Sequence, residues 1–148
     1  MRVRVKTSLN IVLKTSTIER IAMAIPIVPI APSQPYNLHI DFDGIATYNV
    51  LEYARAASGN GWTLSKAIQT AGHSTDPQHD KYALSPIASG EQRLVLVSAN
   101  MSSVTGAAPV SMATHFNQSG APVHSDKASG EDSGALVTLT IRTIFEGK

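Results

Sequence analysis

From residue 36 onward, apolar and polar residues alternate along much of the chain. In YNLHIDFD (residues 36–43), every second side chain is apolar and those between them are polar. This period of two is typical of a β-strand that buries one face and exposes the other. The same alternation, or a short apolar run of strand length, occurs in RLVLVSA (93–99), PVSMATHF (109–116) and ALVTLTIRTIF (135–145). These segments are therefore predicted to be strands.

The segment from residue 45 to residue 57 fits two structures. Ile45, Tyr48 and Leu51 have the spacing of one helix face, and NVLEYARAA is rich in helix-forming residues. However, the SGNG that follows is typical of a turn, and WTLSKAI after it alternates as a strand does. We therefore favour a strand–turn–strand arrangement, with one short helix as the alternative.

Polar stretches separate the predicted strands. QTAGHSTDPQHD (69–80) and NQSGAPVHSDKASGEDSG (117–134) are predicted to be loops, and YALSPIASGEQ (82–92) a strand followed by a turn. Short strands separated by turn residues are typical of two-layer all-β proteins. The predicted fold class is therefore all-β, an antiparallel β-sandwich of about seven to nine short strands that spans residues 36–148.

Residues 1–35 differ from the rest of the chain and are assigned to a separate leader. Residues 1–22 are rich in Ser and Thr and carry five basic side chains against one acidic, a net charge of +4. Three interpretations stay open: a targeting peptide, an extension upstream of a true start at Met23, or an extra strand, because apolar residues alternate there. Residues 23–35 are predicted to be extended, since each proline restricts the residue before it.

Charge and hydropathy exclude some classes of protein. The apolar run IAMAIPIVPIA (21–31) is shorter than the ~18–20 residues that span a bilayer, and two prolines interrupt it. The sequence therefore predicts a soluble protein without a transmembrane segment, and it leaves the location open between a secreted and a cytoplasmic protein. Residues 23–148 carry seven basic and ten acidic side chains, a net charge of −3. This argues against nucleic acid as a partner, because phosphate binding needs a basic face.

Catalytic and metal-binding motifs are missing from the sequence. There is no GxSxG motif, no phosphate-binding glycine motif and no cysteine, so hydrolase, nucleotide and thiol chemistry are not indicated. HSTDPQHD (73–80) contains two His and two Asp, but its spacing matches no closed zinc motif. His39 and Asp41 share the polar, exposed face of their strand, where they could pair. We therefore predict no cofactor and no metal, and a protein that is not an enzyme.

Several segments from residue 36 onward occur in an order that resembles the aegerolysins, small β-sandwich proteins that recognise membrane lipids. They are YNLHIDFD, the GNGW turn, the PIASGEQ turn, the SSVTGA loop and the closing DSGALVTLTIRTIFEGK. The resemblance implies a sandwich fold and recognition of a membrane, or partnership with a pore-forming protein. Aegerolysins typically carry an aromatic cluster in their later half, whereas residues 117–132 contain no Phe, Trp or Tyr. The resemblance therefore assigns no specific binding residue.

The predicted function is a non-enzymatic binding module that recognises membrane lipid headgroups or glycans through loops at one end of the sandwich. Trp62 and Tyr53 are candidate ligand-binding residues, because each joins an apolar body to a polar tip. His73 and Ser102 are candidates because they belong to predicted loops, and loops are where sandwich folds usually carry their binding residues. The alternative is a self-associating structural or assembly β-sandwich protein without a small-molecule ligand, whose edge strands meet copies of itself. The expected partner is thus a membrane lipid, a glycan or a second copy of the chain.

Overall fold

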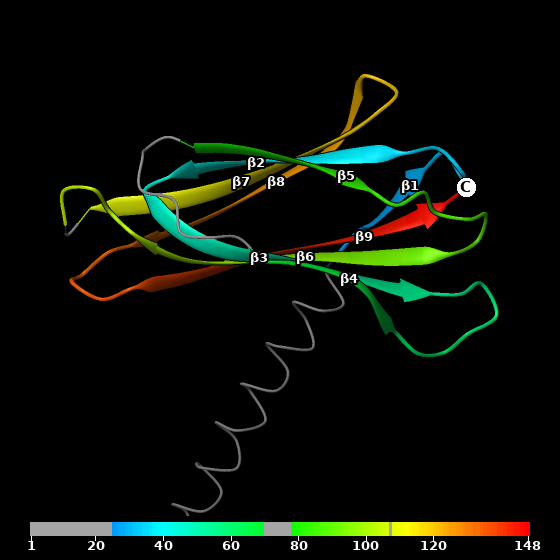
Figure 1. Cartoon of the computed structure of the whole chain (residues 1–148), viewed down its shortest axis with the longest axis horizontal. Helices are drawn as coiled ribbons and strands as arrows, with labels where there is room; N and C mark the ends of the chain where they lie inside the picture. The colour runs from blue at the N-terminus through cyan, green and yellow to red at the C-terminus, as the bar shows by residue number, and fades with distance from the viewer. Residues whose placement is uncertain (1–24, 70–77, 107) are drawn as a thin grey trace, which may run out of the picture.

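The computed structural model of the chain describes residues 25–69, 78–106 and 108–148. These residues form two β-sheets packed face to face (Figure 1). They contain nine strands and no helix, so the predicted all-β sandwich is confirmed. In the described part of the chain there is accordingly no helix with the length and apolarity needed to cross a bilayer.

Consecutive strands are distributed over both sheets. The strands are β1 (Ile27–Ile30), β2 (Tyr36–Asp43), β3 (Ile45–Arg55), β4 (Thr63–Gln69), β5 (Gln78–Leu84), β6 (Gln92–Ser102), β7 (Pro109–Gln118), β8 (Ala121–Glu131) and β9 (Val137–Gly147). One sheet has the spatial order β1-β9-β6-β3-β4 and the other the order β5-β2-β7-β8. Neighbouring strands are antiparallel, except that β1 runs parallel to β9.

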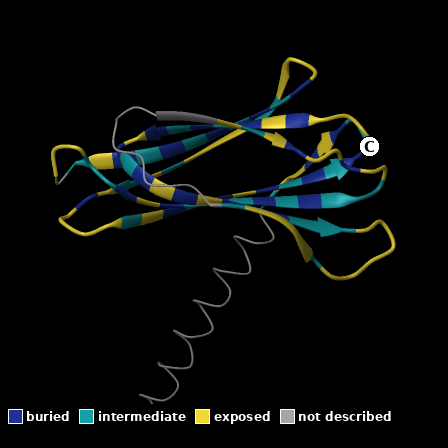
Figure 2. Ribbon diagram, viewed as in Figure 1, coloured by how far each residue is buried: buried dark blue, intermediate teal, exposed yellow. Residues whose placement is uncertain are grey.

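The core lies between the two sheets and is lined by the apolar positions that alternation predicts. The four apolar residues of YNLHIDFD are at most 1% exposed, and buried and exposed residues alternate along strands of both sheets (Figure 2). Phe145 of β9 joins the sheets, because its ring centroid lies 5.3 Å from that of Tyr36 and 4.7 Å from that of Phe116. Burial of this inner face is the main stabilising contribution to the fold.

The ambiguous segment from residue 45 to residue 57 is mostly a strand, as favoured above. β3 pairs with β6 along its whole length, from Ile45–Ser102 to Arg55–Gln92. β4 follows after a turn and pairs with β3. The ladder on both sides of β3 outweighs the helix propensity of NVLEYARAA, because tertiary pairing routinely overrides local preference.

The prediction of a loop from residue 117 to residue 134 is wrong over most of its length, because this segment contains β8. Ser119 and Gly120 have φ angles of 53° and 78°, as a two-residue type I′ hairpin turn requires. This turn brings β8 back against β7. Because β8 lies at the edge of its sheet and most of its side chains are exposed, it forms without a buried apolar stripe. β5 likewise begins within a predicted loop.

The proline-rich stretch before residue 36 contributes a strand to the sandwich. Residues 27–30 are extended, as predicted, and form β1, which pairs with the end of β9, whereas Pro32 and Ser33 form a turn in which the φ angle of Ser33 is 64°. Val28 and Ile30 of β1 are buried in the core. Residues 1–22, for which three interpretations are open, lie outside the described residues.

The connections between strands gather at two ends of the sandwich. The end at the left of Figure 1 holds the connections β2–β3, β6–β7 and β8–β9, and the C-terminus lies at the other end. At Gly44 the chain crosses from one sheet to the other. The φ angle of Gly44 is 131°, and a Cβ atom there would lie 2.9 Å from the carbonyl oxygen of Ser102, so this crossing requires glycine.

Candidate functional site

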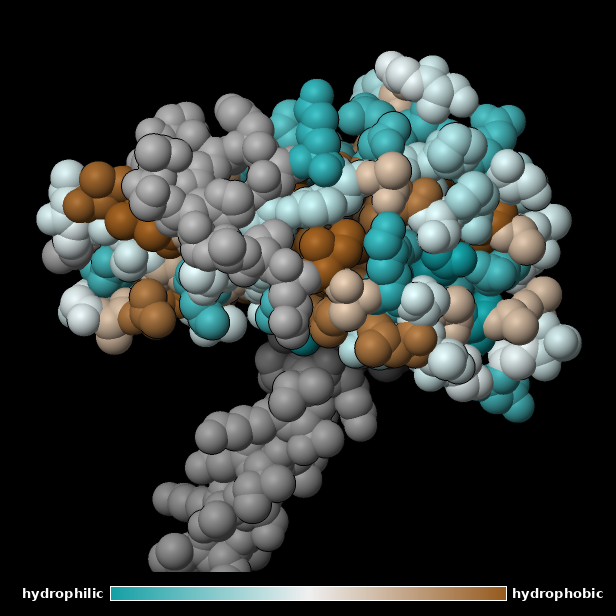
Figure 3. Space-filling model, viewed as in Figure 1, coloured by the Kyte–Doolittle hydropathy of each residue, from teal (hydrophilic) through white to brown (hydrophobic). Residues whose placement is uncertain are grey.

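Two connections at the left end of Figure 1 form an exposed apolar surface, which we call the tip. It consists of the described residues of the β6–β7 connection (103–106 and 108) and of the β8–β9 connection (132–136). Val104 is 58% exposed and Leu136 is 69% exposed, more than any other large hydrophobic side chain in the described part of the chain. Hydrophobic surface is visible at this end in the space-filling view (Figure 3).

Asp132 holds the two connections of the tip together. Its Oδ2 accepts a hydrogen bond from the backbone N–H of Ser103 at 2.9 Å, and its Oδ1 accepts one from the N–H of Gly134 at 2.8 Å. The backbone N–H of Asp132 also donates to the carbonyl oxygen of Ala108 at 3.0 Å. These bonds favour the ionised carboxylate, so first the Ser103 N–H and then the Gly134 N–H lower the pKa of Asp132 below its ordinary value.

The surface of the tip is uncharged. SSVTGAAP (102–109) and SGAL (133–136) contain no charged residue, and the Asp132 carboxylate is buried beneath them. The two connections could therefore be covered by an apolar partner without any charge of their own leaving water. The hydroxyl groups of Ser102, Thr105 and Ser133 provide hydrogen-bonding groups close by.

The structure does not bring the four predicted ligand-binding residues together. Ser102 is the last residue of β6, at the base of the tip, and is half-buried. Trp62 and Tyr53 are also half-buried but lie at the opposite end of the sandwich, by the β3–β4 turn. The guanidinium of Arg55 covers the Trp62 ring at 4.6 Å from its centroid, so one ring face already has a protein partner. His73 lies outside the described residues.

A shallow groove crosses the outer face of the four-stranded sheet, between β2 and β5. It has a volume of about 370 Å³, and Asn37, His39, Lys81 and Asn117 are among its lining residues. The His39 Nε2 atom lies 3.3 Å from Asp41 Oδ1, which confirms that these two side chains pair. Leu38 and Ala83 also line the groove, so its surface is mixed, and its amide, imidazole and ammonium groups could donate hydrogen bonds to a small polar ligand.

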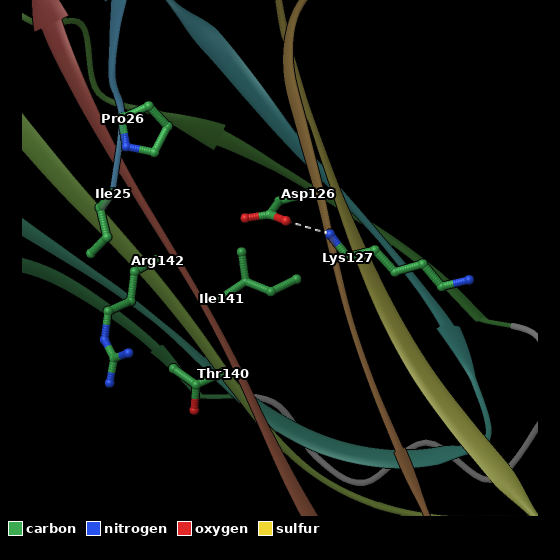
Figure 4. Close-up of a pocket in the computed structure, with 7 residues that line it drawn as sticks. All are labelled: Ile25, Pro26, Asp126, Lys127, Thr140, Ile141 and Arg142. Carbon is green, nitrogen blue, oxygen red and sulfur yellow. Dashed lines mark hydrogen bonds between the residues drawn. The ribbon is translucent and has the colours of Figure 1, made fainter. Parts of the chain in front are cut away.

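A second groove lies where the two sheets part, between β8 and β9 (Figure 4). Its volume is about 280 Å³. The apolar residues Ile25, Pro26 and Ile141 line it, while the side chain of Lys127 extends away from the other labelled residues. The groove follows from the topology, because β1 pairs only with the last residues of β9. The earlier residues of β9 therefore have no strand on that side in the described part of the chain.

A buried ion pair lies inside the sandwich at the end away from the tip. Arg93 Nη1 donates to Glu52 Oε1 at 3.1 Å, and Arg93 Nη2 donates to Glu91 Oε1 at 2.5 Å. Burial opposes the charge of Arg93, but these hydrogen bonds outweigh it and raise the pKa of the guanidinium. Burial, and then the Glu52 carboxylate, also raise the pKa of Tyr36. With Glu52 and Arg93 almost completely buried, the pair fixes β3 against β6 and offers no open binding site.

The exposed apolar residues of the tip were missed by the sequence analysis, although the sequence carries a signal for one of them. In the last predicted strand, Leu136 occupies the register of the polar residues Thr138, Thr140 and Arg142. A large apolar side chain at such a position indicates either a misplaced strand end or an exposed hydrophobic residue. No comparable local pattern identifies Val104 or Asp132.

Comparison with known proteins gives no relative. No protein-family model matches the chain, and neither a curated protein nor a solved structure matches it. The function of the tip therefore has to be argued from its own chemistry. The resemblance to the aegerolysins stays a prediction.

Proposed function

We propose that the protein is a non-enzymatic binding module that recognises membrane lipid through the tip. The observation that carries this proposal is the exposure of Val104 and Leu136 on connections that Asp132 holds together. Exposed apolar side chains on ordered loops are what a protein needs in order to enter the headgroup region without unfolding. The lipid-binding activity implied by the aegerolysin resemblance points in the same direction.

The size of the apolar surface indicates weak, reversible binding. Complete burial of a Val or Leu side chain contributes about 1.5–3 kcal/mol. Because Val104 and Leu136 are only 58% and 69% exposed, we expect about 2–4 kcal/mol from both together. This is less than a single myristoyl chain supplies, which by itself gives only marginal membrane binding. The tip therefore needs contacts to headgroups as well.

The hydroxyl and backbone groups around the two apolar residues could supply these contacts. Ser102 and Thr105 flank Val104, and Ser133 lies in the other connection. A headgroup that offers both donors and acceptors would pair with them, whereas a bare hydrocarbon surface would not. We thus expect these hydroxyl and backbone groups to provide selectivity among lipid headgroups, and the two apolar side chains to insert into the bilayer.

Co-sedimentation of the full chain with lipid vesicles tests the proposal. Neutral phosphatidylcholine vesicles, with and without added phosphatidylserine, separate insertion of the tip from attraction of residues 1–22, whose net charge is +4, to anionic lipid. The V104S/L136S variant should bind neutral vesicles at least about 30-fold more weakly, because it loses about 2 kcal/mol or more of apolar burial.

L64S is the matched control. Leu64 is 51% exposed but lies on β4, away from the tip, so L64S should bind as the unchanged chain does. Equal binding by the unchanged chain and V104S/L136S would overturn the proposal, and so would no pelleting on either vesicle. An oligomer in lipid-free solution that V104S/L136S converts to a monomer, with no lipid binding by the unchanged chain, would instead favour the self-associating protein.

A further inference from the structure

The outer face of the five-stranded sheet changes from polar to apolar along its strands. Successive side chains of a strand point to opposite faces, so each strand places every second residue outward. In the half nearer the tip, three neighbouring strands place hydroxyl and amide side chains outward: Thr47 and Asn49 on β3, Ser98 and Asn100 on β6, and Thr138 and Thr140 on β9. In the half nearer the C-terminus, the same strands place large apolar side chains outward instead.

One row of apolar side chains, which we call the band, crosses all five strands of this face. Its members are opposite one another in the strand ladders: Ile27, Ile144, Leu94, Tyr53 and Leu64, in the spatial order of the strands. Ile27 is 48% exposed and Leu64 is 51% exposed, and the three residues between them are half-buried. Leu51 and Leu96, which are opposite each other, widen the apolar surface at its centre.

The outer face of the four-stranded sheet is different, because its two central strands are polar there. β2 places Asn37, His39 and Asp41 outward, and β7 places His115 and Asn117 outward. No element of the described part of the chain covers the band, since the sandwich has only two layers there. A contiguous apolar surface that is left to water is costly and marks a place where a partner binds.

Charged residues flank the band and limit what can cover it. On β9, Arg142 and Glu146 lie on either side of Ile144. Arg55 shares the row of Glu146, because both are opposite Gln92 of β6. A bilayer that covered the band would take these charges out of water, which costs free energy even where a charge is paired. A second copy of the chain offers them opposite charges.

We propose that the band is the interface of a homodimer, in which the outer faces of two five-stranded sheets pack on each other. Two-fold symmetry permits two arrangements. If the axis runs along the central strand β6, Glu146 faces the partner's Arg55 and Ile144 faces the partner's Tyr53. If the axis runs across the strands at the band, Glu146 faces the partner's Arg142. In both arrangements apolar rows meet apolar rows and Glu146 meets an arginine.

The size of the band indicates a weak dimer. Five strands at ~4.8 Å spacing make it about 24 Å long, and three outward rows with their side chains make it roughly 20 Å wide. Each copy would bury on the order of 500 Å², which is at the low end for a specific interface. We therefore expect a dissociation constant of about 10–100 μM. Vesicle binding measured at ~1 μM chain reports on the monomer, so L64S stays a valid control for the tip.

Sedimentation equilibrium of the full chain in lipid-free buffer, from ~1 to ~300 μM, tests the dimer. The unchanged chain should show a monomer–dimer equilibrium. L94S/I144S removes the centre of the band and should weaken dimerisation at least ~10-fold. V104S/L136S is the matched control, because it removes two exposed apolar side chains at the tip and should dimerise as the unchanged chain does.

Charge reversal tests how the two copies face each other. E146R places an arginine opposite an arginine in either arrangement, so it should weaken the dimer at least ~3-fold. R55E/E146R should restore the dimer if the axis runs along β6, and R142E/E146R should restore it if the axis runs across the strands. Thermal unfolding shows which variants fold, and E146R keeps the band intact even if L94S/I144S does not fold.

Dimerisation that the band and charge variants weaken, and that one of the double charge variants restores, supports the interface. A chain that stays monomeric at every concentration would overturn it. Dimerisation that L94S/I144S and E146R leave unchanged would overturn it too, because the copies would then meet elsewhere. A dimer that E146R weakens and neither double variant restores would contradict the face-to-face arrangement.

Discussion

At the scale of single residues, Asp132 shapes the tip through hydrogen bonds to both of its connections. The carboxylate is buried, and two backbone N–H groups satisfy its oxygens. Because those donors stabilise the charged form, the pKa of Asp132 is lower in the folded chain than its ordinary value of 3.8. The proposed lipid-binding surface therefore depends on the ionisation of one side chain.

The sign of the resulting pH dependence follows from this lowered pKa. A carboxylate whose pKa falls on folding stabilises the folded state above its unfolded pKa, and the contribution is lost as the pH falls through the folded pKa. We expect D132N to unfold at a lower temperature than the unchanged chain at pH ~7, and the difference to shrink once the pH falls below about 4. Thermal unfolding followed by calorimetry measures this.

D43N is the control for the loss of a carboxylate at the same end of the sandwich. Asp43 is exposed and lies next to Gly44. D43N should unfold at about the temperature of the unchanged chain at pH ~7, because the Asp43 side chain is exposed. If D132N and the unchanged chain differ by the same amount at both pH values, the ionised Asp132 does not stabilise the tip.

At the scale of the elements, the end of β9 is held on two sides, by β1 and by the β5–β6 connection. Gly147 pairs with the end of β1, and its carbonyl oxygen accepts a hydrogen bond of 2.8 Å from the N–H of Gly90. Its own N–H donates to the carbonyl oxygen of Glu91 at 3.1 Å. A Cβ atom on Gly147 would lie 2.3 Å from the carbonyl oxygen of Ala88. The β5–β6 connection can pack this closely only against glycine.

We therefore expect G147A to destabilise the fold. The clash is with backbone, which cannot rotate away, so β9 or the connection must move, at a cost of about 1–3 kcal/mol. Urea unfolding followed by the fluorescence of Trp62, the single tryptophan, measures this. G61A is the control, because a Cβ at Gly61 meets nothing within 4 Å; it should stay within about 1 kcal/mol of the unchanged chain. Equal stability of both variants would mean that the connection does not pack tightly on β9.

At the scale of the whole molecule, the sandwich is strongest along its middle and weakest at its edges. β6 has strand neighbours on both sides, β9 and β3. β4 pairs only with β3, and its described side chains are largely exposed. Because local opening costs least where few apolar groups are buried, edge strands open before central ones.

Native-state hydrogen exchange should reveal this gradient. We expect backbone amides of β6 to exchange only through global unfolding and those of β4 to exchange faster, through local opening. Mass spectrometry of peptic fragments after exchange in D₂O measures both strands in one sample. Equal protection of β4 and β6 would show that the sandwich opens only as one unit.

The strands could be predicted from sequence wherever one face is buried in the core. β2, β7 and β9 follow their alternation closely, since successive side chains of a strand point to opposite faces. β8 could not be predicted this way. Its residues are polar on both faces, and the Ser119–Gly120 turn and the pairing with β7 place it in the sheet.

The candidate sites were less accessible to prediction than the fold. The prediction of Ser102 as a binding residue identified one of the two connections of the tip, whereas Trp62 and Tyr53 lie at the end of the sandwich opposite the tip. Which loops share an end depends on strand order and direction, and these are properties of both sheets together. Exposure of Leu136 likewise depends on where β9 begins, and sequence patterns place strand ends poorly.

The sequence by itself determined that this protein is an all-β sandwich, because alternation is a property of neighbouring residues and the need to bury one face of each strand follows from it. Only the tertiary structure decided which polar groups meet. Asp132 accepts a hydrogen bond from Ser103, and the imidazole of His115 lies beside the Asp41 carboxylate. In both cases the two residues are far apart in the chain and are brought together by the pairing of strands. Those pairings are set by the packing of two whole sheets on one core, and no local pattern encodes them.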